Sequence, residues 1–231
     1  ILSAYIYLRY STFLYKTSAV IEIIDKAQDS EMALPTAMTI FNRSMINLEN
    51  EFGRLRSYNL HEETVKTINA NVRYYTIGKI KNFEEHKSSF LPDYKIDMLI
   101  NSDEVTDFLT LDLLFFSDNK MEISYFINGE LENKEVFTSH STKTKKHSLP
   151  IEFHVNNLFF ESDEEFISKK ITISPIRNTV EIYLSSLILE QNNTGRNSYG
   201  SGSDQIKLSM SHPNVNVCED YLFSLINNFD Q

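Results

Sequence analysis

The spacing of apolar residues changes near Pro92, from a helical period to alternation. Before Pro92, apolar side chains recur every three or four positions, which is typical of amphipathic helices. One stripe is Ile6, Tyr10, Phe13, Thr17, Val20, Ile24 and Ala27, and a second is Met38, Phe41, Met45, Leu48, Phe52 and Leu55. Stripes this narrow bury one face against another helix. The sequence predicts a helical hairpin, or a coiled coil with a second subunit.

A third helix is predicted after residue 58. Asn59 and Glu62 form the pattern of a capping box, and a buried face follows at Val65, Ile68, Val72 and Tyr75. The segment can continue towards His86. Phe90-Leu91-Pro92-Asp93 then breaks the pattern, and we place a domain boundary there.

After Pro92, apolar and polar residues alternate, which is typical of half-buried strands. The predicted strands are 96–100, 109–115, 121–127, 130–137, 151–155 and 171–190. Asn128-Gly129 predicts a tight hairpin turn, because both residues tolerate positive φ. The stretch 171–190 is the clearest predicted strand, because Val180, Ile182 and Leu184 alternate with Glu181 and Tyr183, and we expect a bulge at Ser185-Ser186. Strands this closely spaced favour an antiparallel β-sandwich.

The predicted fold class is therefore α+β, with N-terminal helices followed by an antiparallel β-sandwich. Residues 1–91 form a helical region, and residues 92–190 form the sandwich. Residues 191–204 lack an apolar run and read as a flexible linker. Residues 205–231 supply one more strand, at 206–210, and a short amphipathic helix, at 219–229, which pack on the sandwich.

Composition narrows the classes of function. The formal net charge of −10 argues against a nucleic-acid partner, since phosphate binding needs a basic face. Cys218 is the single cysteine, so no disulfide can form within the chain. No phosphate-binding glycine loop and no G-x-S-x-G motif is present. We expect no cofactor, and a hydrolase is the least favoured class.

Two groups of residues could bind a metal. Glu161, Asp163, Glu164 and Glu165 offer four carboxylates within five residues, as calcium prefers, although such a run is more often a solvated loop. His140, His147 and His154 are evenly spaced but fall on a loop and a strand, so independent surface positions are the simpler interpretation.

The segment from Ile1 to Ile24 is apolar and rich in tyrosine. Four tyrosines, Tyr5, Tyr7, Tyr10 and Tyr15, lie close to Arg9 and Lys16. Tyrosine beside a basic residue is common where a membrane helix meets water. The segment is therefore either the outer end of a membrane anchor or an amphipathic core helix.

Residues 122–190 resemble β-sandwich modules in the extracytoplasmic parts of bacterial membrane proteins of surface-polysaccharide assembly. The similarity lies in the hairpin Ile127-Asn128-Gly129-Glu130, the apolar strand within Leu149 to Phe160, and Ile173-Ser174-Pro175-Ile176-Arg177-Asn178 leading into Val180 to Leu189. The chain departs from the pattern at Arg177, which follows the proline instead of preceding it. The resemblance implies a lectin-like or scaffolding role facing the cell envelope or the outside, and it assigns no functional residue.

The function expected from these observations is a non-catalytic, membrane-anchored extracytoplasmic module that binds a glycan or an envelope protein. Its N-terminal helix would reach the membrane, and its N-terminal helices could join copies into a homo-oligomer. Two alternatives stay open: a ligand-sensing ectodomain of a bacterial receptor, and a structural subunit of a filament or particle.

Overall fold

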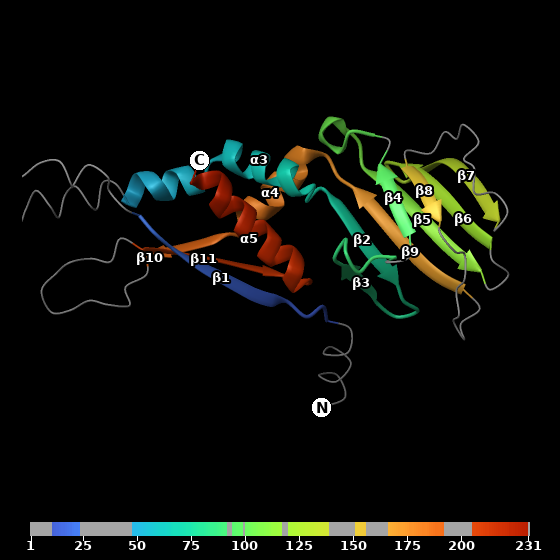
Figure 1. Cartoon of the computed structure of the whole chain (residues 1–231), viewed down its shortest axis with the longest axis horizontal. Coiled ribbons are helices and arrows are strands. Elements are labelled where there is room, and N and C mark those ends of the chain that lie inside the picture. Colours follow the sequence, from blue (N-terminus) through green and yellow to red (C-terminus); the bar gives the residue numbers. More distant parts are fainter. Residues whose placement is uncertain are drawn as a thin grey trace, which may run out of the picture. The chain divides into compact units, whose positions relative to one another are not determined.

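The chain has a mixed α+β fold in which helices and strands are interleaved (Figure 1). The computed structural model describes residues 11–23, 48–91, 94–98, 100–116, 120–138, 151–155, 166–191 and 205–230. These residues divide into two compact units. The six-stranded unit is Ile1–Phe13 with Asn69–Thr179, and the three-stranded unit is Leu14–Ile68 with Val180–Gln231. Each unit is thus assembled from segments that are distant in sequence.

The six-stranded unit is built on an antiparallel sheet with the strand order β3-β2-β9-β5-β6-β7. Its strands are β2 (Val72–Ile77), β3 (Asn82–Glu85), β5 (Leu109–Phe116), β6 (Lys120–Ile127), β7 (Glu130–Thr138) and β9 (Phe166–Ile173). A separate antiparallel pair consists of β4 (Tyr94–Met98) and β8 (Ile151–Val155), and a short 3-10 helix, η2 (Ser102–Glu104), follows β4. The predicted strands between Pro92 and Val155 are therefore confirmed.

The turn between β6 and β7 is the hairpin that Asn128-Gly129 predicts. Asn128 has a φ of 51° and Gly129 a φ of 87°, the left-handed conformations that a type I′ turn needs. The Asn128 side chain also holds the neighbouring loop, because its Oδ1 accepts from Phe108 N at 3.1 Å and its Nδ2 donates to Asp107 Oδ1 at 2.9 Å. The turn fixes the register of the two strands that it joins.

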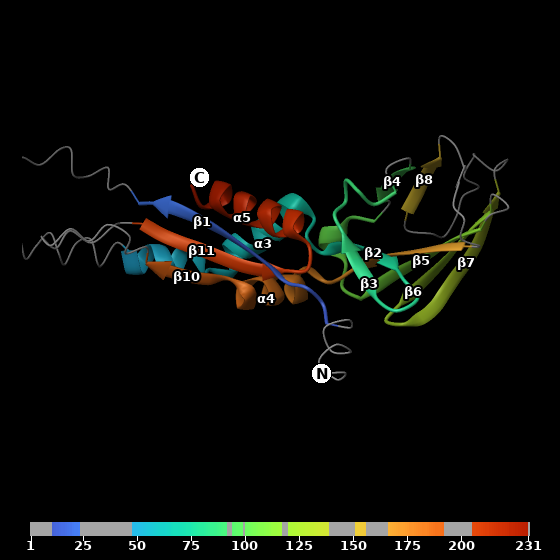
Figure 2. The same cartoon turned by 90° about the horizontal axis from the view of Figure 1, so that it is seen from below.

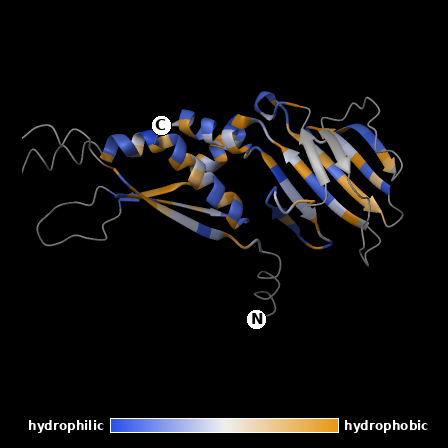
Figure 3. Ribbon diagram, in the orientation of Figure 1, coloured by the Kyte–Doolittle hydropathy of each residue, from blue (hydrophilic) through white to orange (hydrophobic). Residues whose placement is uncertain are grey.

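One face of the six-stranded sheet forms the core of its unit. Alternate residues along β5, β6 and β9 are buried there, and Figure 3 shows the alternation of apolar and polar positions along the strands. Phe90 and Leu91, from the segment after β3, and Val105, from the segment before β5, belong to the same buried cluster. The largest fully buried side chains of this face are Leu111, Leu113, Met121, Ile123, Ile171 and Ile173. Residues one position away along each strand point to the opposite face.

The three-stranded unit combines an antiparallel sheet, in the order β1-β11-β10, with several helices (Figure 2). The strands are β1 (Tyr15–Glu22), β10 (Ile188–Gln191) and β11 (Gln205–His212). The helices are residues 48–55, α3 (Tyr58–Ile68), α4 (Ile176–Ser186), whose first residues belong to the other unit, and α5 (Val215–Phe229). Helix α5 packs against β1, β11 and α3. The predicted C-terminal strand and helix are thus confirmed, and the helix is longer than expected.

The strand predicted at 171–190 is confirmed only at its two ends, 171–173 in β9 and 188–190 in β10, and it is wrong between them, because Ile176–Ser186 forms α4. Val180 and Tyr183 are buried while Ile182 is exposed, as a helical period requires. Pro175 O accepts from Thr179 N at 3.2 Å, so the proline stands where a helix begins and its missing N–H is harmless. The bulge predicted at Ser185-Ser186 falls in the last turn of the helix.

The predicted pair of N-terminal helices is also wrong where it can be compared, because Tyr15–Glu22 is strand β1. Thr17, Ala19 and Ile21 are half-buried and alternate with exposed residues. The part of the second stripe that the structure describes, residues 48–55, is helical, with Leu48 and Leu55 buried. The rest of that stripe lies outside the described residues, as do residues 192–204 of the predicted linker. Within residues 11–23 and 48–55, the two stripes therefore form one strand and one helix instead of a helical hairpin.

The third predicted helix is confirmed only as far as Ile68. Asn69 follows it with a φ of 51°, a left-handed conformation that commonly ends a helix. Val72 and Tyr75, predicted on the buried face of the helix, lie in β2 instead. At the other end, Ser57 Oγ accepts from Leu60 N at 3.4 Å, so Ser57 caps the helix in place of Asn59. The predicted domain ranges 1–91, 92–190, 191–204 and 205–231 stay predictions about independent folding.

Candidate functional site

The face of the six-stranded sheet opposite the core carries an ordered set of polar side chains. Two rows cross the strands on this face. The first, which we call the polar row, consists of Glu84, Tyr75, Lys170, Asp112, Ser124 and Lys134. The second row consists of Arg73, Thr172, Thr110, Phe126 and Leu131. Neighbouring strands lie about 4.8 Å apart, so each row is a continuous strip of adjacent side chains.

Charges alternate along the polar row and neutralise one another locally. Lys170 Nζ lies 3.3 Å from Asp112 Oδ1, and Lys134 Nζ lies 2.8 Å from Glu122 Oε1 one row away. These side chains are about one-fifth to one-half exposed, so the ion pairs remain in contact with water. Partly exposed pairs contribute little to stability, about 0–1 kcal/mol each. Their donors and acceptors are therefore available to exchange partners with a ligand.

Tyr75 is the polar-row residue on β2 and lies next to Arg73 and Thr172 of the second row. Burial raises the pKa of its hydroxyl, the carboxylate of Glu84 raises it further, and Arg73 and Thr172, which hydrogen-bond to it, lower it in part. The hydroxyl is consequently neutral at physiological pH and can both donate and accept. A neutral phenol, alternating charges and the apolar ring of Phe126 on one surface suit a ligand rich in hydroxyl groups.

A second polar cluster lies on the core side of the same sheet. Lys169 Nζ donates to Glu85 Oε1 at 2.9 Å, to Glu85 Oε2 at 3.0 Å and to Thr76 Oγ1 at 2.7 Å. The Thr76 hydroxyl in turn donates to Glu85, and the ammonium of Lys169 lies 5.4 Å from the centre of the Phe90 ring. Lys169 is only 13% exposed, so this cluster joins β2, β3 and β9 and presents little surface to a ligand.

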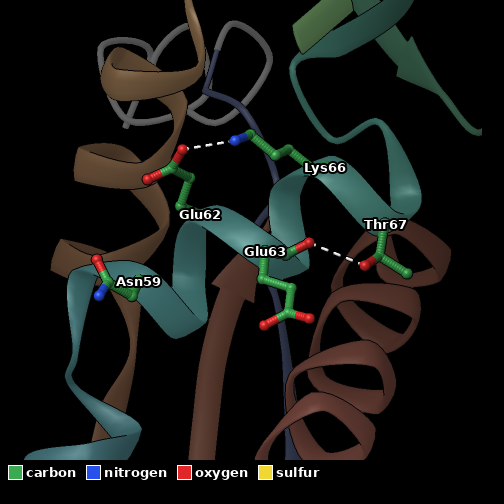
Figure 4. Close-up of a pocket in the computed structure, with 5 residues that line it drawn as sticks. All are labelled: Asn59, Glu62, Glu63, Lys66 and Thr67. Carbon is green, nitrogen blue, oxygen red and sulfur yellow. Dashed lines mark hydrogen bonds and ion pairs between the residues drawn. The ribbon is translucent and has the colours of Figure 1, made fainter.

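A shallow depression lies on the outer face of α3 in the three-stranded unit (Figure 4). It is lined by Asn59, Glu62, Glu63, Lys66 and Thr67, all from one helix. Lys66 Nζ pairs with Glu62 Oε1 at 2.6 Å, and Thr67 Oγ1 donates to the carbonyl of Glu63 at 2.8 Å. Such contacts one turn apart are ordinary features of a solvated helix face. The depression is therefore the weaker candidate.

The predicted metal ligands Glu161, Asp163, Glu164 and Glu165 lie outside the described residues, and so do His140 and His147. His154 lies in β8. Within the ranges given above, no three or more His, Cys, Asp or Glu side chains gather in a way that could hold a metal ion. None of the helices in those ranges is long and apolar enough to cross a membrane.

Cys218 lies in the interior of the three-stranded unit. Its Sγ is 3.6 Å from the carbonyl of Met210, and burial raises the pKa of its thiol. A reactive cysteine needs a lowered pKa and access to solvent. Cys218 is consequently a core residue, and His212, its nearest histidine in sequence, binds the backbone N–H of Asn214 through Nδ1 at 3.1 Å.

Neither row was predicted from the sequence. The alternation at Thr110, Asp112, Glu122 and Ser124 marks the polar face of two strands, and this signal was available. Tyr75 and Lys170 join that face only because β9 pairs with both β2 and β5. Comparison with models of protein families finds no match to the chain, and comparison with curated proteins finds none either.

Proposed function

We propose that the chain is a non-catalytic, membrane-tethered extracytoplasmic module whose polar row binds a glycan or an envelope protein. The observation that supports this proposal is the strip of half-exposed side chains around Tyr75, Lys170 and Asp112 on an otherwise regular sheet. The separate β4–β8 pair would be the second layer of a small sandwich. Sheet faces of this kind offer a rigid platform for extended ligands, because a strand backbone holds each side chain at a fixed spacing.

Polar-row variants test the binding proposal. A glycan array probed with the 231-residue chain would identify ligands, and titration calorimetry would measure their affinity. We expect Tyr75→Ala and Asp112→Ala each to weaken binding by about tenfold, as loss of one hydrogen bond of about 1.4 kcal/mol would. Tyr58→Ala, at an exposed tyrosine of α3, is the matched control and should bind normally. Absence of any glycan ligand, or equal affinity in all variants, would remove the glycan proposal.

A topology reporter tests the location. Fused after Gln231 in the full-length gene product, a reporter active only outside the cytoplasm should give a signal. Activity of a cytoplasmic reporter at the same site would contradict an extracytoplasmic module. This result does not depend on which ligand the polar row binds.

Self-association is a second proposal, and it rests on β1. Among the residues that the structure describes, this strand is an edge of its sheet, and Tyr15 and Val20 on it are about half exposed. An open edge presents unpaired N–H and C=O groups that a second chain can meet. Light scattering should then give a mass above 26.9 kDa that falls when Ala19 is replaced by proline. A monomer at high concentration would exclude this arrangement.

A further inference from the structure

The turn between β2 and β3 presents apolar and basic side chains together at one tip. Its sequence from residue 78 is Gly-Lys-Ile-Lys-Asn-Phe. Gly78 N donates to Lys81 O at 3.2 Å, and a Cβ at Gly78 would lie 2.5 Å from the same oxygen. Only glycine fits there without displacement of the backbone. The tip is therefore a tight, defined projection, not a loose loop.

Lys81 binds the segment that leads to β1 onto this tip. Its Nζ donates to the carbonyl of Ser11 at 2.6 Å, and it lies 5.1 Å from the ring centre of Phe13 and 5.8 Å from that of Phe83. Both rings therefore lie around one ammonium group, at distances typical of cation–π contacts. Phe13 belongs to the same compact unit as the tip.

The large apolar side chains of the tip are open to solvent. Phe13 is 64% exposed, Ile80 56% and Phe83 57%. We call Phe13, Lys79, Ile80, Lys81 and Phe83 the tip patch. Single exposed apolar residues are common on soluble proteins, but two exposed rings around Lys81, with Lys79 and Ile80 next to it in the same turn, form a distinct surface.

We infer that the tip patch contacts the surface of an anionic phospholipid membrane. Aromatic and aliphatic side chains beside lysine match the boundary between headgroups and acyl chains, where rings insert and ammonium groups reach the phosphates. The chain carries a net charge of −10, so a locally basic tip would be the part that an anionic surface attracts. The residues just before Ser11 are apolar and contain three tyrosines and Arg9, the pattern expected at the end of a membrane helix.

The inference rests on the proposed function, because the tether is what would bring the tip patch to a membrane in the cell. The affinity of the tip patch for lipid can be measured separately. The 231-residue chain would be sedimented with vesicles of phosphatidylcholine and phosphatidylglycerol, and with vesicles of phosphatidylcholine alone. We expect tighter binding to the anionic vesicles, weakened by salt at about 0.5 M. The double variant Ile80→Ser/Phe83→Ser should lose about tenfold or more of the partition coefficient, and Lys79→Gln about fivefold.

A matched control lies at the opposite edge of the same sheet. Leu131→Ser/Val136→Ser removes two apolar side chains that are 56% and 59% exposed on β7, and it should bind vesicles as the parent chain does. Circular dichroism would confirm that each variant is folded. As a second measurement without substitution, amide hydrogen exchange should slow at residues 78–83 when anionic vesicles are added.

Four outcomes would overturn the inference: no vesicle binding, equal loss in the tip and β7 variants, unchanged exchange at the tip in bound protein, or a tip variant that partitions like the parent chain. The last outcome would assign the vesicle binding to residues 1–10 alone. The proposed function fails separately. A signal from the cytoplasmic reporter would contradict the proposed tether without bearing on vesicle binding. A tip patch that does not bind lipid would leave the proposed glycan binding by the polar row untouched.

Discussion

The hydroxyl of Tyr221 supports a buried histidine in the three-stranded unit, and its removal should be costly. His61 Nε2 lies 2.9 Å from the carbonyl of Leu55, and His61 Nδ1 lies 2.6 Å from Tyr221 Oη. A carbonyl only accepts, so Nε2 carries the proton and Nδ1 of the neutral ring must accept. Burial lowers the pKa of His61 and raises that of Tyr221, which keeps both groups neutral. Tyr221 is therefore the donor.

The size of the effect follows from the burial of both partners. His61 and Tyr221 are each 0% exposed, so water cannot replace a lost donor. Tyr221→Phe keeps the ring, whose centre lies 4.0 Å from that of the stacked Tyr183 ring, and leaves Nδ1 of His61 without its donor. A buried group left unsatisfied costs about 1–3 kcal/mol. With an m-value of about 2 kcal/mol/M in urea, the unfolding midpoint should fall by about 0.5–1.5 M.

Far-UV circular dichroism in urea is a suitable assay, because α5, the longest of the described helices at 15 residues, and α3, at 11 residues, both lie in the three-stranded unit. Tyr58→Phe is the control. Tyr58 is 41% exposed at the start of α3, and its substitution should change stability by less than about 0.5 kcal/mol. If the midpoint of Tyr221→Phe fell no further than that of Tyr58→Phe, with equal m-values, the assignment of Tyr221 as donor to a buried acceptor would be refuted.

Three further predictions concern charge and burial. The pKa of His61 is lower in the folded than in the unfolded chain, so the unfolded chain binds the proton first, and the free energy of unfolding should fall below about pH 6.5 by up to about 1.4 kcal/mol per pH unit. The urea midpoint of His61→Gln, measured over the same pH range, should decline less than that of the parent chain. Lys169→Met leaves Glu85 without its cation and should lower the free energy of unfolding by about 2–3 kcal/mol, whereas Lys170→Met, on the more exposed face, should lower it by about 0–1 kcal/mol. Hydrogen exchange of β2 and β9 would measure both losses, and equal losses would contradict the argument from burial. Cys218 should react with iodoacetamide slowly in buffer and rapidly in urea, and a fast native reaction would show that the thiol is accessible.

The strands between Pro92 and Val155 could be predicted because apolar and polar residues alternate along them. Leu109, Leu111 and Leu113 alternate with Thr110 and Asp112, and that pattern fits only a half-buried strand. Asn128-Gly129 fixed the hairpin without any tertiary information, since positive φ is a local property. Local rules were therefore sufficient wherever they agreed with burial.

Prediction from the sequence failed where a helical period and a strand period fit the same residues. Val180, Tyr183 and Leu187 are spaced as on a helix, while Val180, Ile182 and Leu184 alternate as in a strand. The choice is made by Pro175 at the start of the helix and by the burial of Tyr183 against Tyr221, a residue of α5. Strand β1 is decided in the same way, because its partner β11 comes from the far end of the chain. Long-range pairing overrides local propensity in both cases.

The polar row could not have been predicted at all without the order of strands. Its members come from β2, β3, β5, β6, β7 and β9, and no motif joins them. Alternation shows that Asp112 and Lys170 each lie on a polar face, but two polar faces could equally belong to different sheets. The register between β5 and β9, which sets Asp112 opposite Lys170, is the information that the sequence lacks.

The turn that carries the tip patch follows β2, the strand that supplies Tyr75 to the polar row, and this restricts what the row can meet. Tyr75 lies three residues before Gly78, where the turn begins, a separation of about 10 Å along an extended chain. If the tip patch touches lipid, Tyr75 is therefore the residue of the row on the strand that leads to that contact. Lys134, at the other end of the row, lies four strand spacings further across the sheet, or about 19 Å. A ligand bound at Tyr75 must then lie at the membrane surface, whereas a ligand bound only at Lys134 could lie further from it. The affinity of vesicle-bound protein for the ligand, measured for Tyr75 and Lys134 variants, separates these two cases: the variant with the larger loss marks the end of the row that binds.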